Sequence, residues 1–340
     1  WPTSARQITW FWTEERKNAN LPSQPLDGII AITPDFIANF LELTGPLTVD
    51  GITFNSNNFA IELEKIVEFD YVQRGVATEN RKDIIGDLSA EMIRRFYKLS
   101  AREMLDLWRI MKRNIDEKQI IAWLSDQELQ NYFSAENWSG EVKGYDGDYL
   151  YLVDANLGAL KTDQVIKRKI NYSIDVSRDK KLSATVKITY NYLGSKITDL
   201  ITRYRTYTRI YVPEGVTWLR LYTIDESGQK QYQDSEIEYG KELGKSYAGV
   251  FLTVEPGKNK TLVAEYILPD NLQQKYARGD YGLLIQKQPG TAGHQLEIAL
   301  RFDKKIGAYL FNKTVDYLRG GELGLNWDLL SDRTMNVKLR

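Results

Sequence analysis

Cysteine is absent from this sequence, and histidine occurs only once, as His294. The absence of cysteine excludes disulfide bonds, thiol catalysis and metal sites with cysteine ligands. A catalytic triad or a histidine-bound metal would depend on His294 alone, in a stretch with strand-like alternation. A structural histidine is by far the more frequent case in such a position. A chain without cysteine also suits a bacterial envelope protein that avoids disulfides.

A strong net charge and a long hydrophobic run are also lacking. The net charge is −1 over 340 residues, which gives no support for a nucleic-acid partner or a basic membrane-binding face. No apolar run reaches the ~18 residues of a membrane-spanning helix. The chain has 42% apolar residues, enough for real cores, and a length that favours two domains. Its 21 tyrosines and 8 tryptophans suit extracellular β-domains that contact carbohydrate, and they suit core packing equally well.

The first 138 residues predict a helix-rich α/β domain. Apolar residues at three- and four-residue spacing, with capping or breaking residues at the ends, indicate helices. Short apolar runs at 27–33 and 47–49 indicate strands. The expected helices lie at 1–20, 34–43, 56–69 and 78–97, after Ser100, and at 116–124 and 126–133.

The helix expected at 78–97 carries the main candidate residue. Its inward apolar stripe consists of Ile85, Leu88, Met92 and Phe96, widened by Ile84 and Ile93. Arg81 continues this stripe at the helix start, where unpaired N–H groups and a partial positive charge favour a carboxylate or phosphate. The alternative is that Arg81 pairs with an internal carboxylate, Glu68 or Asp70.

The polar stretch 139–160 is expected to form a linker and an entry strand. Asp146 and Asp148 in it could hold a cation, although two carboxylates fall short of a calcium loop and a solvated turn is the default. Over 161–340 the apolar period changes from 3.6 to 2, with proline and glycine turn signals between short strands. This pattern predicts an antiparallel, Ig-like β-sandwich. Residues 320–340 are expected to add a hairpin that turns at Ser331 and Asp332.

Short segments along nearly the whole chain resemble the bacterial domain-of-unknown-function 4012 family, in the family's order. They are WPTSA at 1–5, DGIIAI at 27–32, TGP at 44–46, ENRK at 79–82, VDANLGALKT at 153–162, RIYVP at 209–213 and QKQPG at 286–290. The resemblance implies a cell-surface protein on the extracellular side of the cytoplasmic membrane. Because the chain does not begin with Met, we read it as a fragment or a processed form and expect a membrane anchor upstream of Trp1.

The order of elements in the first half is also similar to the second half of LytR-CpsA-Psr domains. The first strands of those domains would precede Trp1, so this half lacks them. Those enzymes transfer polyprenyl-pyrophosphate-linked glycopolymers onto peptidoglycan, and arginines at the start of the equivalent helix hold the pyrophosphate. Arg81 matches one of these arginines. The second is missing, and Lys82 or Arg74 would have to replace it, so the resemblance implies an anion pocket more directly than catalysis.

The sequence leaves two functions open and does not decide whether the chain is an enzyme. In the first, the chain binds or transfers a polyprenyl-phosphate glycan or a cell-wall polymer, with a divalent cation as cofactor if it is a transferase. In the second, it is a surface structural, adhesive or self-assembling protein without catalysis, in which strand edges or aromatic patches support homo-oligomers. A carbohydrate-binding module is a third reading. It needs a row of exposed rings, for which the candidates are Trp218, Tyr222, Tyr204 and Tyr207.

Overall fold

The computed structural model describes residues 1–158, 161–195, 197–198, 200–232 and 236–340. The chain divides into two compact units. Unit 1 comprises Trp1–Glu141 and Pro289–Thr291, and unit 2 comprises Val142–Gln288 and Ala292–Arg340. The fold is therefore a mixed α and β multidomain one, helix-rich in unit 1 and built on two large sheets in unit 2. Among the described residues, none of the helices combines the length and the apolar character needed to cross a membrane.

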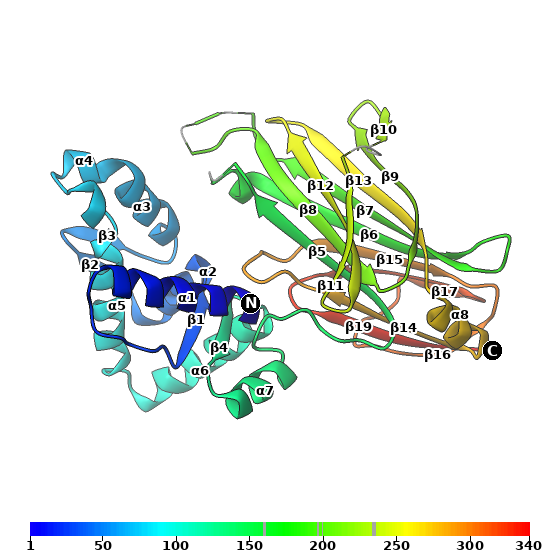
Figure 1. Cartoon of the computed structure of the whole chain (residues 1–340), viewed down its shortest axis with the longest axis horizontal. Coiled ribbons are helices and arrows are strands. Elements are labelled where there is room, and N and C mark those ends of the chain that lie inside the picture. Colours follow the sequence, from blue (N-terminus) through cyan, green and yellow to red (C-terminus); the bar gives the residue numbers. More distant parts are fainter. Residues whose placement is uncertain (159–160, 196, 199, 233–235) are drawn as a thin grey trace. The chain divides into compact units, whose positions relative to one another are not determined.

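Unit 1 packs its helices around a small apolar core beside two short antiparallel sheets (Figure 1). In these sheets residues 28–32 pair with 120–124, and residues 47–49 pair with 52–54. Ile37, Phe40, Phe54 and Leu107 are among the core side chains. The elements are α1 (Pro2–Asn18), β1 (Gly28–Ile32), α2 (Pro34–Thr44), β2 (Leu47–Val49), β3 (Ile52–Phe54), α3 (Phe59–Lys65), a π-helical segment (Ile66–Asp70), α4 (Tyr71–Gln73), a 3-10 turn (Thr78–Asn80), α5 (Asp83–Phe96), α6 (Ala101–Asp116), β4 (Ile120–Leu124) and α7 (Gln127–Ala135).

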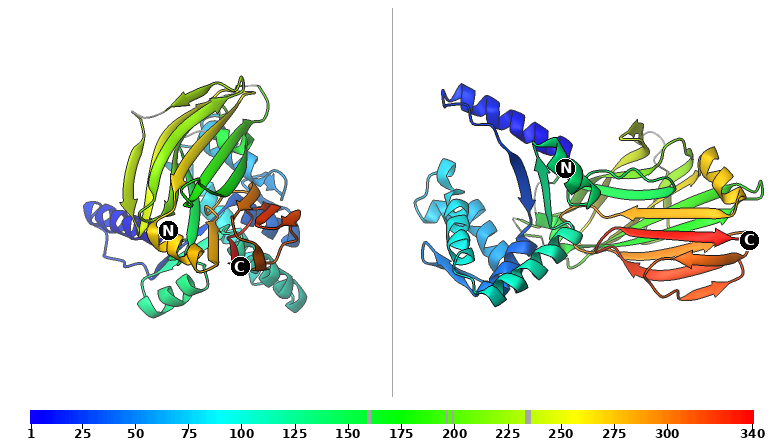
Figure 2. Two further views of the ribbon diagram at one scale, coloured as in Figure 1. Left: turned by 90° about the vertical axis from the view of Figure 1, so that its right-hand side faces the viewer. Right: turned by 90° about the horizontal axis from the view of Figure 1, so that it is seen from below.

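Helix α1 is loosely attached to the rest of unit 1. Burial within this helix is confined to Pro2 and Ala5. Figure 2 shows α1, in dark blue, lying apart from α3, α4 and α5. Trp10 and Phe11 consequently expose 54% and 52% of their surface, so an aromatic stretch of this helix faces solvent.

Three expectations for unit 1 are wrong in whole or in part. The stretch expected as a helix at 116–124 ends in a strand, β4, because β1 supplies a ladder of partners from about 90 residues earlier in the chain. The helix expected from 78 begins at Asp83 instead, with Arg81 ahead of it and Lys82 at its N-cap. Of the predicted inward stripe, α5 buries Leu88 together with the flanking Ile84, whereas Ile85, Ile93 and Phe96 are exposed.

Within the described residues, unit 2 contains an eight-stranded and a seven-stranded sheet (Figures 1 and 2). Inward side chains of both sheets share one large apolar core. The eight-stranded sheet has the order β10 (Lys230–Tyr232), β9 (Thr217–Asp225), β13 (Asn259–Ile267), β7 (Leu182–Tyr192), β6 (Ile166–Val176), β15 (Gln295–Arg301), β18 (Glu322–Asp328) and β17 (Tyr317–Arg319). The seven-stranded sheet has the order β11 (Glu238–Glu242), β12 (Lys245–Val254), β8 (Tyr204–Pro213), β5 (Asp148–Asn156), β14 (Asp280–Gln286), β19 (Arg333–Leu339) and β16 (Ile306–Leu310). A 3-10 turn (Lys161–Val165) precedes β6, and α8 (Asp270–Ala277) precedes β14.

Unit 2 departs from the expected antiparallel sandwich in two ways. Each large sheet is mixed, because β5 pairs with β14 and β6 with β15 in parallel. The expected hairpin of residues 320–340 is also wrong, since β18 and β19 belong to different sheets and the chain crosses between them. Of the stretch expected as linker and entry strand, 139–160, residues 148–156 form the central strand β5, and 159 and 160 lie outside the described residues.

Candidate functional site

Two of the three predicted cationic residues of unit 1, Arg81 and Arg74, lie against carboxylates of their own chain. An Nη1 of Arg81 is 3.4 Å from Glu68, which is one of the two partners considered above. An Nη2 of Arg74 is 3.7 Å from Asp50. Lys82 is exposed at the start of α5, where Asp83 already supplies a negative charge to the helix N-terminus. Arg81 and Arg74 therefore belong to two separate, partly exposed ion pairs. Together they do not form a vacant anion-binding site.

The outer face of the eight-stranded sheet carries a groove of about 650 Å³. Its floor is one row of small residues that lie side by side across four strands. Consecutive members are register partners, from Thr185 on β7 through Ser173 on β6 and Ala299 on β15 to Gly324 on β18. Because small side chains meet in a single row, the sheet surface is hollowed at right angles to its strands.

Larger polar side chains line the groove on one side of this floor. This wall is the next row of register partners, Lys187, Asn171, Glu297 and Asn326. Glu297 accepts one hydrogen bond from the side-chain amide of Asn171, and its carboxylate lies 2.6 Å from the ammonium of Lys169. Arg301, on the other side of the floor, donates to Asp175 at 2.9 and 3.0 Å. Ion pairs with outside neighbours thus hold two of the charged lining residues in place.

One end of the groove is closed by an aromatic ring. Tyr317 on β17 pairs with Gly324 on β18, and its ring lies over the glycine. A Cβ at position 324 would lie 2.1 Å from Cε1 of that ring, so only glycine leaves room for it. Asp316, beside Tyr317, accepts hydrogen bonds from the backbone N–H and the amide of Asn326 at 2.8 and 2.6 Å. The ring is 45% exposed and offers a flat apolar surface to a ligand in the groove.

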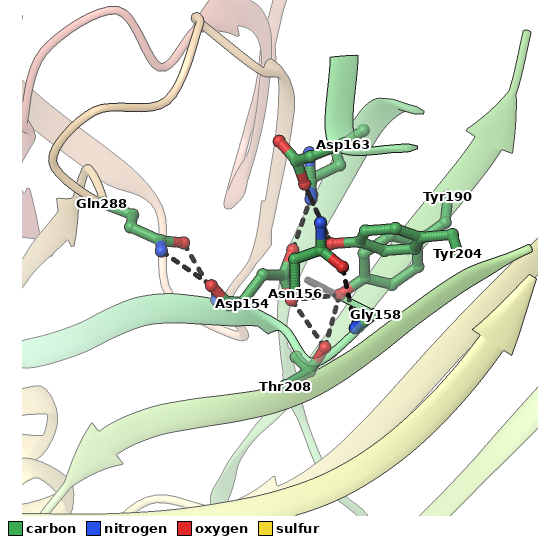
Figure 3. A network of polar contacts seen from close by, with 9 residues as sticks. Asp154, Asn156, Gly158, Asp163, Tyr190, Tyr204, Thr208 and Gln288 are labelled. Atoms are coloured by element: carbon green, nitrogen blue, oxygen red, sulfur yellow. Dashed lines mark hydrogen bonds and ion pairs between the residues drawn. The ribbon is translucent and has the colours of Figure 1, made fainter. Parts of the chain in front are cut away.

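A second polar cluster lies between the two sheets around Asp154 (Figure 3), and Arg168 is its central cation. Arg168 on β6 donates to Asp154 on β5 at 2.6 Å, and these side chains are 6% and 9% exposed. The same guanidinium donates to Tyr204 and pairs with Asp163. Asp154 also accepts from Tyr190 at 2.8 Å and from Thr208 at 2.6 Å. We call these residues the buried network.

Within the buried network, the positive charge of Arg168 is compensated by nearby carboxylates. Burial by itself lowers the pKa of Arg168, but Asp154, Tyr204 and Asp163 more than reverse this effect, so its pKa is raised and the side chain stays charged. His294 lies near the same charges. Burial, reinforced by the positive charge of Arg168, lowers the pKa of His294 to about 4, so the imidazole is neutral at neutral pH. The buried network therefore has the character of a cross-link between sheets.

Asp148, expected in a solvated turn, is 1% exposed at the start of β5. It accepts hydrogen bonds from the hydroxyl of Tyr281 at 2.6 Å, from the N–H of Tyr149 at 2.8 Å and from the hydroxyl of Tyr172. Burial raises the pKa of Asp148 to about 6, although these hydrogen bonds oppose the rise. Among the described residues, no group of three or more histidine, aspartate or glutamate side chains could hold a metal ion.

The rings proposed for a carbohydrate-binding row do not form one. Tyr204 and Tyr222 are buried at 0% and 6% exposure, Trp218 packs on Tyr266, and the ring of Tyr207 lies over Gly249. The groove residues were not identified from the sequence. The available signal was a small residue at an outward position in each of several strands with apolar–polar alternation. Only the strand register shows that these small residues are neighbours.

No protein-family model matches the chain, and no curated protein matches it. Solved structures match weakly. A candidate nutrient-binding protein of Legionella pneumophila gives a TM-score of 0.31 at 9% identity, over 56% of this chain and 71% of that one. Yeast LTA4 hydrolase in complex with bestatin gives 0.29 at 9% identity, over 51% and 28%. An M1 zinc metallopeptidase of Deinococcus radiodurans gives 0.25 at 10% identity, over 51% and 42%. Likenesses this weak carry no argument about function.

Proposed function

We propose that this chain is an extracytoplasmic cell-envelope protein that binds an extended glycan in the groove of unit 2. The observation that carries the proposal is the floor of small residues between polar side chains, closed by the ring of Tyr317. Sugar hydroxyls need donors and acceptors in fixed positions, which amide, carboxylate and guanidinium groups supply. The apolar face of a sugar ring packs on an exposed aromatic ring. The groove offers both kinds of contact along one line.

Binding without catalysis is the activity that the groove supports best. Its two carboxylates are Glu297 and Asp316, and each is engaged by neighbouring donors rather than poised as an acid–base pair. Hydrolysis of a glycosidic bond needs two carboxyl groups that face each other across the bond. The wall groups instead have the fixed orientation that suits recognition.

The family and the finer fold belong to the same proposal. We propose that the chain belongs to the domain-of-unknown-function 4012 family, with unit 1 as a LytR-CpsA-Psr-like half and unit 2 as an Ig-like sandwich. The support in the sequence is the order of the motifs for the family, the order of elements in the first half for the LytR-CpsA-Psr likeness, and the alternation of apolar residues for the sandwich. A pyrophosphate at Arg81, Lys82 and Arg74 would first have to replace Glu68 and Asp50. These partly exposed pairs are each worth about 0–1 kcal/mol. A lipid-linked glycan therefore remains compatible with the proposal, but these residues carry less of it than the groove does.

The test is a calorimetric titration of the whole chain with defined oligosaccharides. Ala299→Tyr puts a ring on the half-buried floor and is expected to abolish binding. Asn191→Tyr adds the same ring to the same sheet face, at a position that does not line the groove, and should bind like the unaltered chain. If both variants bind normally, the groove is not the site. If the unaltered chain binds no oligosaccharide from a broad array, the proposal is wrong.

Self-assembly is the second candidate function, and the exposed side chains of α1 favour it. Ile8, Trp10 and Phe11 expose 42%, 54% and 52% of their surface. A helix with such exposed apolar side chains can bury them against another copy of the chain. Light scattering over a range of concentrations tests this, with Trp10→Ser and Phe11→Ser combined as the variant. A monomer at every concentration would rule the role out.

A further inference from the structure

The groove contains a charged side chain that its neighbours do not satisfy. Glu297, Arg301 and Asp316 are each held by a partner described above. In the part of the chain that the structure describes, the ammonium of Lys187 makes no hydrogen bond or ion pair. Lys187 is exposed on β7, beside Asn171 by register and two residues from Thr185 on the same face. The groove therefore presents one open positive charge at its β7 end.

We infer that the glycan bound in the groove is acidic and seats a carboxylate or phosphate group on Lys187. The inference rests on the proposed function and specifies its ligand class. A neutral sugar offers the ammonium only uncharged hydroxyl oxygens as acceptors. An acidic group gains a charge-assisted hydrogen bond there, and the hydroxyl of Thr185 and the amide of Asn171 are close enough in register to donate to the remaining oxygens.

The two ends of the groove also set a minimum ligand length. Lys187 lies on β7, and the ring of Tyr317 lies over Gly324 on β18. β7 and β18 are three strand spacings apart, which is about 14 Å. A monosaccharide cannot touch the ring and the ammonium at once. Affinity is therefore expected to rise steeply with chain length until both ends are reached, and to level off afterwards.

The experiment compares three probes on the whole chain. Oligogalacturonides carry carboxylates, glycerol phosphate oligomers carry phosphodiesters, and cello-oligosaccharides are neutral. We expect an acidic probe to bind more tightly than the neutral one, and Lys187→Gln to weaken that binding about fivefold. Lys167→Gln removes the same charge from the same sheet face outside the groove and is expected to leave affinity unchanged. Preference for one acidic probe over the other identifies the anionic group.

The outcomes separate this inference from the proposed function. If cello-oligosaccharides bind as tightly as both acidic probes and Lys187→Gln has no effect, the acidic class is wrong and the glycan site stands. If Lys167→Gln weakens binding as much as Lys187→Gln, the effect is one of overall charge and the seat at Lys187 is wrong. If none of the probes binds, the proposed function fails together with the inference. Circular dichroism of both variants checks that each is folded.

Discussion

The buried network and the groove use similar side chains on opposite faces of the same strands. Arg168 and Ser173 both belong to β6, and one points between the sheets while the other points outward. Inside, Arg168 is matched by Asp154, Asp163 and the hydroxyl of Tyr204. Outside, Lys187 is left without a partner among the described residues. Since an unpaired charge is costly only when it is buried, an open charge is tolerated in the groove and not in the network.

This difference assigns the two clusters separate roles. The network joins the two sheets, because Asp154 and Thr208 come from one sheet and Arg168 and Tyr190 from the other. Its groups have little freedom to exchange partners with a ligand. The groove has the same polar chemistry on an accessible surface, where a ligand can replace water. Accessibility, rather than residue type, therefore separates the structural cluster from the candidate binding site.

The largest expected effect comes from removing the buried cation. Arg168→Met leaves the carboxylate of Asp154 buried without its partner, and we expect a loss of about 3–5 kcal/mol of unfolding free energy. Arg301→Met breaks the exposed pair with Asp175 and should cost at most about 1 kcal/mol. Urea unfolding followed by tryptophan fluorescence measures both. Equal losses would mean that burial does not distinguish the clusters.

A smaller effect is expected from Asp148, through pH. Its pKa of about 6 in the folded chain exceeds the ordinary 3.8, so between these values the folded state binds more protons than the unfolded state. The stability contributed by this group is therefore complete below about pH 4 and declines as the pH rises to about 6, by about 2–3 kcal/mol. Asp148→Asn should remove this decline from unfolding curves recorded between pH 4 and 7. An unchanged pH profile in the variant would contradict the assignment.

The smallest effect on stability is expected in the groove. Gly324→Ala places a methyl group where the ring of Tyr317 lies, and the ring must swing away. The backbone of Gly324 is ordinary, so the cost should stay below about 1 kcal/mol. Glycan affinity should nevertheless fall to the level of Tyr317→Ala, and the double variant should lose no more. Additive losses would show that the ring and the glycine act independently.

For unit 2, the sequence predicted the positions of the strands better than it predicted which strands pair with one another. Alternation identified β6, β7, β13 and β15 because one face of each is buried. The parallel pairings were missed because they join strands more than 120 residues apart, and periodicity carries no information about pairing. The β18–β19 turn was misread for the same reason, since a hairpin and a crossing between sheets share the same local turn residues.

The candidate sites were predicted less well. Arg81 was correctly placed near Glu68 as an alternative, but its position inside a helix was wrong because α5 begins at Asp83. The exposure of Ile85 and Phe96 also shows that a helical apolar stripe does not ensure burial. The floor of the groove needs four strands in register, and even Ser173 and Ala299 become neighbours only through the pairing of β6 with β15. No local sequence property of Ser173 or Ala299 indicates that the residue belongs to the floor of a groove.

The parallel pairings have a consequence for how unit 2 acquires its structure. β5 and β6 receive their partners β14 and β15 only from the last quarter of the chain, as Asp148 beside Leu283 and Lys169 beside Gln295 illustrate. A nascent chain emerging from the ribosome therefore completes the strands from β5 to β13 while the edges of β5 and β6 are still open. Proteins dominated by contacts between residues so far apart in sequence typically fold on the millisecond-to-second scale. The half-made sandwich, with two unsatisfied edges, is the state in which this protein is most exposed to aggregation.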